Sequence, residues 1–356
     1  MNRPVHMGLA STLVGLALAC GGTAPPLPPE ETVKVPSEGT VVVYVEAPRR
    51  LAGPVLKTFG GQTGISVEAH YREQDPASFY QSLKSEAQAR RVDLVWTASP
   101  LLAIDLVRSD LALPFRPAGA RPVPGQYRDR GSRWIGFAAD PRVIIFNQDQ
   151  VSRDSAPQSF DDLVEGPWAG KAVVARIADG PPAYQAASLF ARRGDETART
   201  FFDRIITAGN RVVPSDVEVR QMVASGEAAW GIIDLDMAIC AKRQAEPVHI
   251  FFPDRMAIGT VVVPQAAVLV RGAPHPDQAR GLFGYLFATE TAWLVGQNDC
   301  ALLSLLPITA MGISKPEWVP LLGAINVMSV DNEQVYDAYV RQTAYFGSWG
   351  GAPAAR

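Results

Sequence analysis

The stretch 226–238, Gly-Glu-Ala-Ala-Trp-Gly-Ile-Ile-Asp-Leu-Asp-Met-Ala, decides the fold class that the rest of the chain must fit. Gly226 follows an apolar helical pattern and is expected to be the glycine that ends a helix. Residues 228–233 form a short apolar run, which predicts a strand buried on both faces. Asp234 and Asp236 follow it, and the two-residue period of a strand predicts that both side chains leave on one side. In an open α/β sheet, ligands bind beyond such strand ends.

Strands and helices alternate along much of the chain. The first pair is a buried strand, Thr40–Val45, and a helix with its apolar face over residues 51–59, which Gly60-Gly61 is expected to end. Further strands are predicted at 65–71, 92–96, Ala172–Ala175 and Arg211–Val213, with helices between them. This alternation predicts an α/β fold with a mostly parallel sheet covered by helices.

Two extended apolar segments are too long for ordinary strands. They are residues 134–146, which Asp140-Pro141 is expected to interrupt, and residues 259–270. We interpret them as two crossings between two α/β lobes, with a ligand between the lobes and closure by a hinge motion. The predicted boundaries are 39–136 plus 262–310 for lobe 1, 137–261 for lobe 2, and 311–356 for a helical C-terminal segment that packs on the lobes.

The N-terminus has the pattern of an export signal. Arg3 supplies a positive charge, and residues 7–19 are apolar but too few to span a membrane. The segment ends Leu-Ala-Leu-Ala-Cys20, so we expect residues 1–20 to be a lipoprotein signal peptide and Cys20 to carry a lipid. Ordinary signal cleavage with an incidental Cys20 is the alternative, and either route exports the chain. Residues 21–38 are rich in Pro and Gly, which predicts a tether.

Composition and motifs exclude several classes of function. The 356 residues carry a formal net charge of -3, so no basic excess indicates nucleic acid as a partner. The sequence has no Gly-x-Ser-x-Gly, His-Glu-x-x-His or Gly-x-Gly-x-x-Gly motif. We therefore expect a binding protein without a cofactor and without catalytic residues, and we also expect it to be a monomer.

Two cysteines follow Cys20, at positions 240 and 300. An exported chain can form a disulfide between them. Two unpaired core thiols are the alternative, because isolated buried cysteines are common.

Polar residues gather at predicted strand ends, where both lobes would direct them into one crevice. The candidate ligand-binding residues are Tyr44, Glu46, Thr97, Ser99, Phe137, Arg176, Asp179, Gly180, Asp234 and Asp236. Asp234 and Asp236 would hold a hard cation or an ammonium group, although an aspartate here also suits a helix cap. Arg176 with Asp179-Gly180 at a helix start suits an anion, and an Arg176–Asp179 ion pair is the alternative.

Several motifs, taken in order, resemble the periplasmic ferric-iron-type solute-binding proteins of ABC importers. They are 40–44 (TVVVY), 51–59 (LAGPVLKTF), 63–65 (TGI), 92–96 (VDLVW), 134–139 (WIGFAA), 143–147 (VIIFN), 168–171 (WAGK), 223–227 (VASGE) and 272–276 (GAPHP). The resemblance implies a periplasmic binding protein-like (type II) fold, two α/β lobes on a two-strand hinge.

The chain departs from this family at the family's ligand positions. Asp236-Met237 stands where ferric members have two tyrosines, Ala47-Pro48 where many have a histidine, and Ala98 where they have a glutamate. The resemblance therefore implies the family's scaffold without its usual ferric ligands.

Together these observations predict a periplasmic or cell-surface lipoprotein, anchored through Cys20. It would capture a small molecule or metal complex, iron included, and deliver it to an ABC permease in the inner membrane. Two alternatives remain: a sensory protein that presents its ligand to a receptor, and an enzyme that has taken over the fold.

Overall fold

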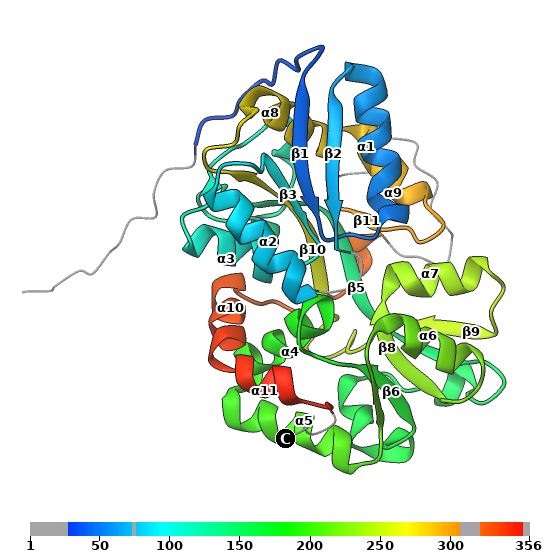
Figure 1. Ribbon diagram of the computed structural model, residues 1–356. Helices are drawn as coiled ribbons and strands as arrows, with labels where there is room; N and C mark the ends of the chain where they lie inside the picture. Colours follow the sequence, from blue (N-terminus) through cyan, green and yellow to red (C-terminus); the bar gives the residue numbers. More distant parts are fainter. Residues whose placement is uncertain (1–27, 73–75, 307–320, 352–356) are drawn as a thin grey trace, which may run out of the picture.

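The computed structural model describes residues 28–72, 76–306 and 321–351. It shows two α/β lobes, one above the other, joined by long strands that run between them (Figure 1). The strands are β1 (Thr40–Val45), β2 (Ser66–Tyr71), β3 (Leu94–Thr97), β4 (Ala112–Leu113), β5 (Ile135–Asn147), β6 (Ala172–Ala175), β7 (Arg211–Val213), β8 (Trp230–Asp234), β9 (Val248–Phe251), β10 (Val262–Val270) and β11 (Leu303–Ser304). Cys20 and the expected signal peptide lie outside the described residues.

The helices fill the intervals between these strands. They are α1 (Arg49–Thr63), α2 (Pro76–Gln88), α3 (Pro100–Arg108), α4 (Gly180–Arg193), α5 (Asp195–Thr207), α6 (Asp216–Ala224), α7 (Leu235–Arg243), α8 (Pro276–Leu286), α9 (Thr289–Gln297), α10 (Asn332–Arg341) and α11 (Thr343–Ser348). The predicted alternation is confirmed, since each of β1, β2, β3, β6, β7 and β8 is followed by a helix.

The sheet order is β2-β1-β3-β10-β5-β8-β6-β7. In lobe 1, β1 is parallel to β2 and β3. In lobe 2, β6 is parallel to β7 and β8. The register with β5 and β10 places the carboxyl ends of β3 and β8 nearest the junction of the lobes, at Thr97 and Asp234. Both lobes therefore direct strand ends toward the same region.

Strand β5 runs unbroken through residues 135–147, so the expected interruption at Asp140-Pro141 is wrong. Its first part, through Pro141, pairs with β10, and Arg142 to Phe146 pair with β8. Proline donates no backbone hydrogen bond and is tolerated where a ladder ends. Pro141 lies at this change of partner, which explains why the strand continues through it.

Helix α1 passes through Gly60-Gly61, where its end was expected, and stops at Gly64. An interior glycine costs only about 1 kcal/mol relative to alanine, which packing can offset. Gly64 has φ 76° and donates its N–H to the Gly60 carbonyl at 2.9 Å. Pro54 lies inside α1, where it leaves the Arg50 carbonyl without its helical donor. The Asn298 side-chain amide supplies that hydrogen bond instead, at 2.8 Å.

Both chain ends of the described region pack on the body. Residues 28–38 lie within the expected tether, and there the Glu31 N–H donates to the Arg116 carbonyl at 3.0 Å. Near the other end, α10 packs on α4 and α3, and α11 follows it beside α5 (Figure 1). The Tyr336 hydroxyl of α10 reaches Asp105 of α3 at 2.9 Å. The C-terminal helices thus contact both lobes.

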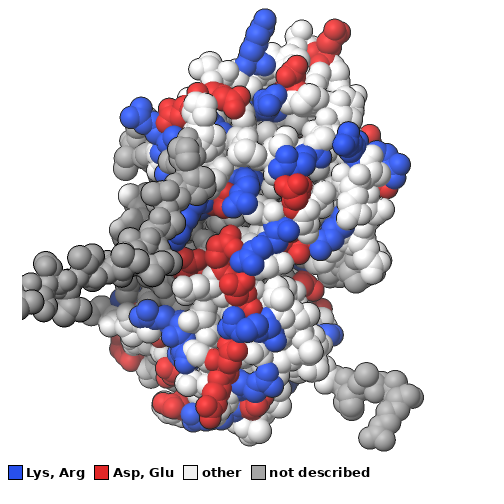
Figure 2. Space-filling model, turned by 90° about the vertical axis from the view of Figure 1, so that its left-hand side faces the viewer, with Lys and Arg blue, Asp and Glu red and all other residues white. Residues whose placement is uncertain are grey.

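The surface charge is mixed in sign. Figure 2 shows a face on which basic and acidic side chains alternate, without a broad area of either. This agrees with the formal net charge of -3. Among the described helices, none combines the length and apolarity needed to cross a bilayer.

Candidate functional site

The site begins where β8 passes directly into α7. Asp234 is the last residue of the strand and the N-cap of the helix, with φ -68° and ψ 145°. Asp236 already lies in the first helical turn. The two-residue strand period therefore does not apply to Asp236, and that step of the sequence reasoning is wrong. Acidic side chains are favourable at this helix end, because the helix dipole is positive there.

Asp234 and Asp236 nevertheless meet, together with a third aspartate from β5. One carboxylate oxygen each from Asp140, Asp234 and Asp236 lies within 4.8 Å of the other two. Asp140 is 3% exposed and accepts the backbone N–H of Asp236 at 3.1 Å. We call these three residues the aspartate cluster. A cluster of this kind can bind a hard cation, which takes oxygen ligands.

A buried arginine compensates one side of the cluster. Arg142 is 2% exposed, and its Nη1 donates to Asp234 at 2.7 Å and to Asp216 at the start of α6. Its Nη2 donates to Asp216 at 3.2 Å, and its Nε to Gln185 at 3.0 Å. Burial alone would lower the pKa of Arg142, but the carboxylates of Asp216 and Asp234 raise it above the ordinary value. Arg142 therefore stays charged.

A second arginine, from the opposite lobe, compensates the negative charge on the other side of the aspartate cluster. Arg50, in the first turn of α1, donates through Nη2 to Asp236 at 2.9 Å and to the Met237 sulfur at 3.1 Å. Its Nε points to Cys300 at 3.1 Å. Asp236 thus contacts lobe 1 although the helix that carries it belongs to lobe 2.

The three cluster carboxyls hold protons more strongly than free aspartate does. Burial raises the pKa of Asp234 to about 7, against the lowering effect of Arg142. Burial likewise raises the pKa of Asp236 to about 6, against Arg50. Burial and the neighbouring Asp236 raise the pKa of Asp140 well above its usual range. A cation that binds here must therefore displace protons.

A second polar group joins the lobes around Glu46. The Glu46 carboxylate accepts the Tyr80 hydroxyl at 2.5 Å and the backbone N–H of Ala98 at 2.9 Å. Arg72 lies 4.0 Å from Glu46 and donates to Asp179 of lobe 2 at 2.8 Å. Burial alone would lower the pKa of Arg72, but Glu46, Tyr80 and Asp179 raise it. We call Glu46, Arg72, Tyr80 and Asp179 the Glu46 group.

The other expected site residues are distributed as follows. Tyr44 is buried, hydrogen-bonds Ser82 at 3.1 Å and stacks on His70. Ser99 caps α3 through the N–H of Leu101, and the Thr97 hydroxyl accepts the N–H of Ser99. Phe137 is 2% exposed and packs edge-on against Trp96.

Arg176 and Asp179 do not form the pair that the sequence offered as an alternative. Asp179 pairs with Arg72, and Gly180, at φ 63°, begins α4 beside the same guanidinium. Arg176 is exposed, and only its backbone N–H has a hydrogen bond, to Val213, within the described part of the chain.

The sequence reasoning did not select Asp140, Arg142, Asp216 or Arg50 as site residues. The sequence does contain a signal for Asp140 and Arg142. Both are charged residues inside the apolar run 134–146, where burial without a partner would be costly. Arg50 gave no such signal, because its partner Asp236 lies 186 positions away.

Comparison of the chain with known proteins identifies a family to which its sequence is similar. Residues 105–306, which include the aspartate cluster, match the family described as bacterial extracellular solute-binding protein. A probable ABC transporter periplasmic-binding protein of Sinorhizobium fredii is 23% identical over 285 residues, which cover 77% of this chain and 74% of that protein.

Solved structures confirm the expected fold. Apo ferric ion-binding protein A of Pasteurella haemolytica superposes with a TM-score of 0.75 at 19% identity, over 88% of this chain and 99% of the other. The periplasmic binding protein AfuA of Actinobacillus pleuropneumoniae, solved with fructose-6-phosphate, gives 0.74 at 17% identity, over 87% and 98%. These relatives are binding proteins rather than enzymes, as expected. The matching segment covers more than half of the chain, which therefore belongs to the bacterial extracellular solute-binding protein family.

Proposed function

We propose that this protein captures a small solute between its two lobes and delivers it to the permease of an ABC importer. Family membership and the S. fredii relative support this role. The arrangement of the lobes also supports it, because their strand ends face one junction and ion pairs such as Arg72–Asp179 cross it. A solute that adds contacts to both lobes would favour the closed form.

The solute we propose is a hard cation or a metal complex, and the aspartate cluster is the observation that carries this proposal. Three carboxylates within 4.8 Å of one another repel, so their approach needs compensation. With Asp216 included, four carboxyls face two guanidinium groups, those of Arg142 and Arg50, within the part of the chain that the structure describes. The fully ionised group thus has an excess of negative charge, which a cation would neutralise.

Iron remains within this class, but its ligands would differ from those of the ferric relatives. Asp236-Met237 supplies a carboxylate and a thioether where two tyrosines were expected by resemblance. A ferric ion or ferric complex would be held here by carboxylate oxygens rather than by tyrosinates. The fructose-6-phosphate complex of AfuA is a reminder that this fold also accommodates ligands of other kinds.

Export and lipid anchoring complete the proposal. The leader over residues 1–20, with Cys20 after Leu-Ala-Leu-Ala, supports attachment to a membrane by a lipid on that cysteine. Residues 28–38 of the Pro-rich stretch 21–38 pack on the body, so reach from the membrane to a permease would come from the part of the stretch before them.

Titration calorimetry tests the ligand class. Ferric citrate, Mn²⁺ and Ca²⁺ would be titrated separately into wild-type protein and into Asp140→Asn. Asparagine can still accept the Asp236 N–H, so this variant removes charge while keeping that hydrogen bond. The matched control is Asp277→Asn, whose side chain is 75% exposed. We expect at least one probe to bind wild type and the control alike, and Asp140→Asn at least tenfold more weakly. Equal binding to all three proteins, or binding of anionic solutes only, would refute the cation class.

A further inference from the structure

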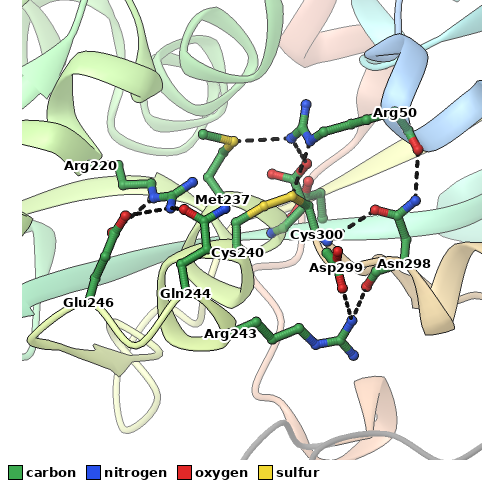
Figure 3. Close-up of a disulfide and its surroundings, with 12 residues drawn as sticks. Arg50, Arg220, Met237, Cys240, Arg243, Gln244, Glu246, Asn298, Asp299 and Cys300 are labelled. Carbon is green, nitrogen blue, oxygen red and sulfur yellow. Dashed lines mark hydrogen bonds and ion pairs between the residues drawn. A yellow bond between two sulfur atoms is a disulfide. The ribbon is translucent and has the colours of Figure 1, made fainter.

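The two cysteines that the sequence left unassigned form a disulfide, Cys240–Cys300, with Cα atoms 4.6 Å apart (Figure 3). Cys240 is 4% exposed and lies in α7, the helix that begins with the site residues Asp234 and Asp236. Cys300 is 2% exposed and lies between α9 and β11. One end of the disulfide therefore lies four residues after Asp236 and six after Asp234 of the aspartate cluster.

Its two ends belong to different lobes. Helix α7 belongs to lobe 2, because it continues β8 and packs on α6, β8 and β9. The segment after α9 belongs to lobe 1, because the Leu302 N–H donates to the Val295 carbonyl of α9, and α9 packs on α1. The disulfide is thus a covalent connection between the lobes that is separate from the crossing strands β5 and β10.

Polar contacts reinforce the same connection (Figure 3). From lobe 2, Arg243 of α7 donates to the backbone carbonyls of Gln297 and Asn298 and pairs with Asp299. From lobe 1, Arg50 donates to Asp236 and Met237 at the start of α7. The disulfide therefore lies within a belt of contacts that joins α7 to lobe 1.

The other side of the site has no such covalent bond among the described residues. In Figure 1, α7 lies to the right of the crossing strand β5, and α2 and α4 lie to its left. On that left side the lobes are joined by noncovalent contacts, which include the Arg72–Asp179 ion pair at 2.8 Å and the packing of α10 on both α3 and α4. Both side chains of the ion pair are partly exposed, at 22% and 36%, so water can replace the pair when it breaks.

We propose that the Cys240–Cys300 disulfide is a covalent latch that makes the lobes open on one side only. Cys240 lies six residues beyond Asp234, about 9 Å further along the axis of α7, so the bond holds the helix that carries the site residues. Disulfides span Cα separations up to about 6.8 Å, so a bond that now spans 4.6 Å leaves the two lobes only about 2 Å of relative movement at this point. Larger opening must occur around α7, by separation of α4 from Arg72 together with loss of the contacts that α10 makes with α3 or with α4.

The latch has a consequence for solute capture, which rests on the function proposed above. Because Arg50 and Asp236 stay close in the open form, this half of the site is ordered before a solute arrives. A pre-ordered site loses less conformational freedom on binding. The solute would then reach the cluster from the Arg72–Asp179 side.

Solution scattering on the solute-free protein tests the latch without assuming any ligand, so a failed function proposal leaves the test intact. Oxidised wild type would be compared with Cys240→Ser/Cys300→Ser and with wild type treated with dithiothreitol. In that treatment the two thiols of the reagent give two electrons and two protons to the disulfide and close to a cyclic disulfide. The radius of gyration of a chain of this length is about 20 Å, and we expect it to be roughly 1 Å larger in both unlatched proteins. Identical scattering of all three folded proteins would overturn the proposal, as would two free thiols in the purified protein.

A second measurement keeps the disulfide intact, so it applies even if the unlatched proteins do not fold. Asp179→Asn removes the ion pair on the opposite side, and hydrogen exchange is then followed along the chain. We expect faster exchange at Ala183 in the first turn of α4 and at Arg72, whose N–H donates to the Val45 carbonyl, with the amides of α7 from Ala238 to Arg243 unchanged. Equal acceleration in α7 would contradict opening on one side.

Discussion

Arg142 and Asp234 face each other as register partners in the antiparallel pair of β5 and β8, and their side chains form an ion pair at 2.7 Å. The same two residues are therefore paired both through their backbones and through their charged side chains. Because β5 also pairs with β10 of lobe 1, the strand that joins the lobes carries the arginine that organises the site. The geometry of the site is therefore built into the crossing strand rather than into a loop.

Replacing Arg142 tests how strongly this pair supports the fold. Arg142→Met leaves Asp216 and Asp234 without their buried partner, and losing one member of a buried ion pair costs about 3–5 kcal/mol. Arg271→Met is the matched control, because Arg271 pairs at the surface with Asp110, whose side chain is 85% exposed. An exposed pair is worth about 1 kcal/mol or less. Urea unfolding measures both free energies, and equal losses would contradict the structural role of Arg142.

The raised pKa values predict how stability depends on pH. Each cluster carboxyl binds its proton more tightly in the folded than in the unfolded chain, so folding is favoured where the folded carboxyl is protonated. That contribution is complete below about pH 4 and is lost as pH rises through about 6 for Asp236 and 7 for Asp234.

Urea unfolding at a series of pH values, without added metal, measures this loss. Between about pH 4 and 7.5 we expect Asp140→Asn to gain stability relative to wild type, because burial raises the pKa of Asp140 and the neutral amide can be buried without taking up a proton. Asp277→Asn corrects for a general change of charge at the surface. A difference between Asp140→Asn and wild type that stays constant with pH would show that the cluster does not titrate in this range.

Much of the fold could be predicted from the sequence because its signals are local. The apolar runs of β1, β6 and β7 are bounded by turn residues, and their predicted limits agree with the structure. Gly194 ends α4 with φ 83°, as a glycine stop signal predicts. The end of α1 was misjudged because packing, not propensity, decides whether Gly60-Gly61 continues a helix.

The site could be predicted only in part because its contacts are distant in sequence. Asp234 and Asp236 were selected from a local pattern, and the structure brings them together. Their partners Arg142 and Arg50 lie 92 and 186 positions away, and Asp179 pairs with Arg72 over 107 positions. Such pairs depend on strand register and lobe closure, which no local periodicity encodes. The Cys240–Cys300 pairing, over 60 positions, was likewise one of two open alternatives.

Metal binding should release protons if the cluster is the site. At pH 6 the cluster carboxyls hold protons that a bound Mn²⁺ must displace, whereas at pH 8 fewer remain. We expect the affinity for Mn²⁺ to rise at least tenfold from pH 6 to pH 8. Calorimetry in two buffers of different ionisation enthalpy should show proton release at pH 6. A pH-independent affinity would place the metal elsewhere.

Lipid attachment at Cys20 can be tested in cells. When the full chain is expressed in a bacterium with labelled palmitate, we expect label on wild type and none on Cys20→Ala. The alanine variant should appear in the soluble periplasmic fraction, with its thermal unfolding unchanged. Equal labelling of both proteins would rule out Cys20 as the anchor, and an unlabelled wild type would favour ordinary signal cleavage.

Removing the disulfide should also weaken the whole fold, because the bond closes a long loop. Its ends are 60 residues apart, and the chain-entropy treatment gives about 4 kcal/mol for a loop of this length. Cys240→Ser/Cys300→Ser should therefore unfold at a lower urea concentration. Its free energy of unfolding should be smaller by about that amount, less any strain that loss of the bond relieves. Reduced wild type is the matched comparison, since it has the same two positions free without the substitutions. If both proteins lost less than about 1 kcal/mol, the unfolded chain would not be restrained by the bond. Because unfolding of the two unlatched proteins reports loop closure while their scattering reports lobe opening, the bond's contribution to stability can be separated from its effect on motion.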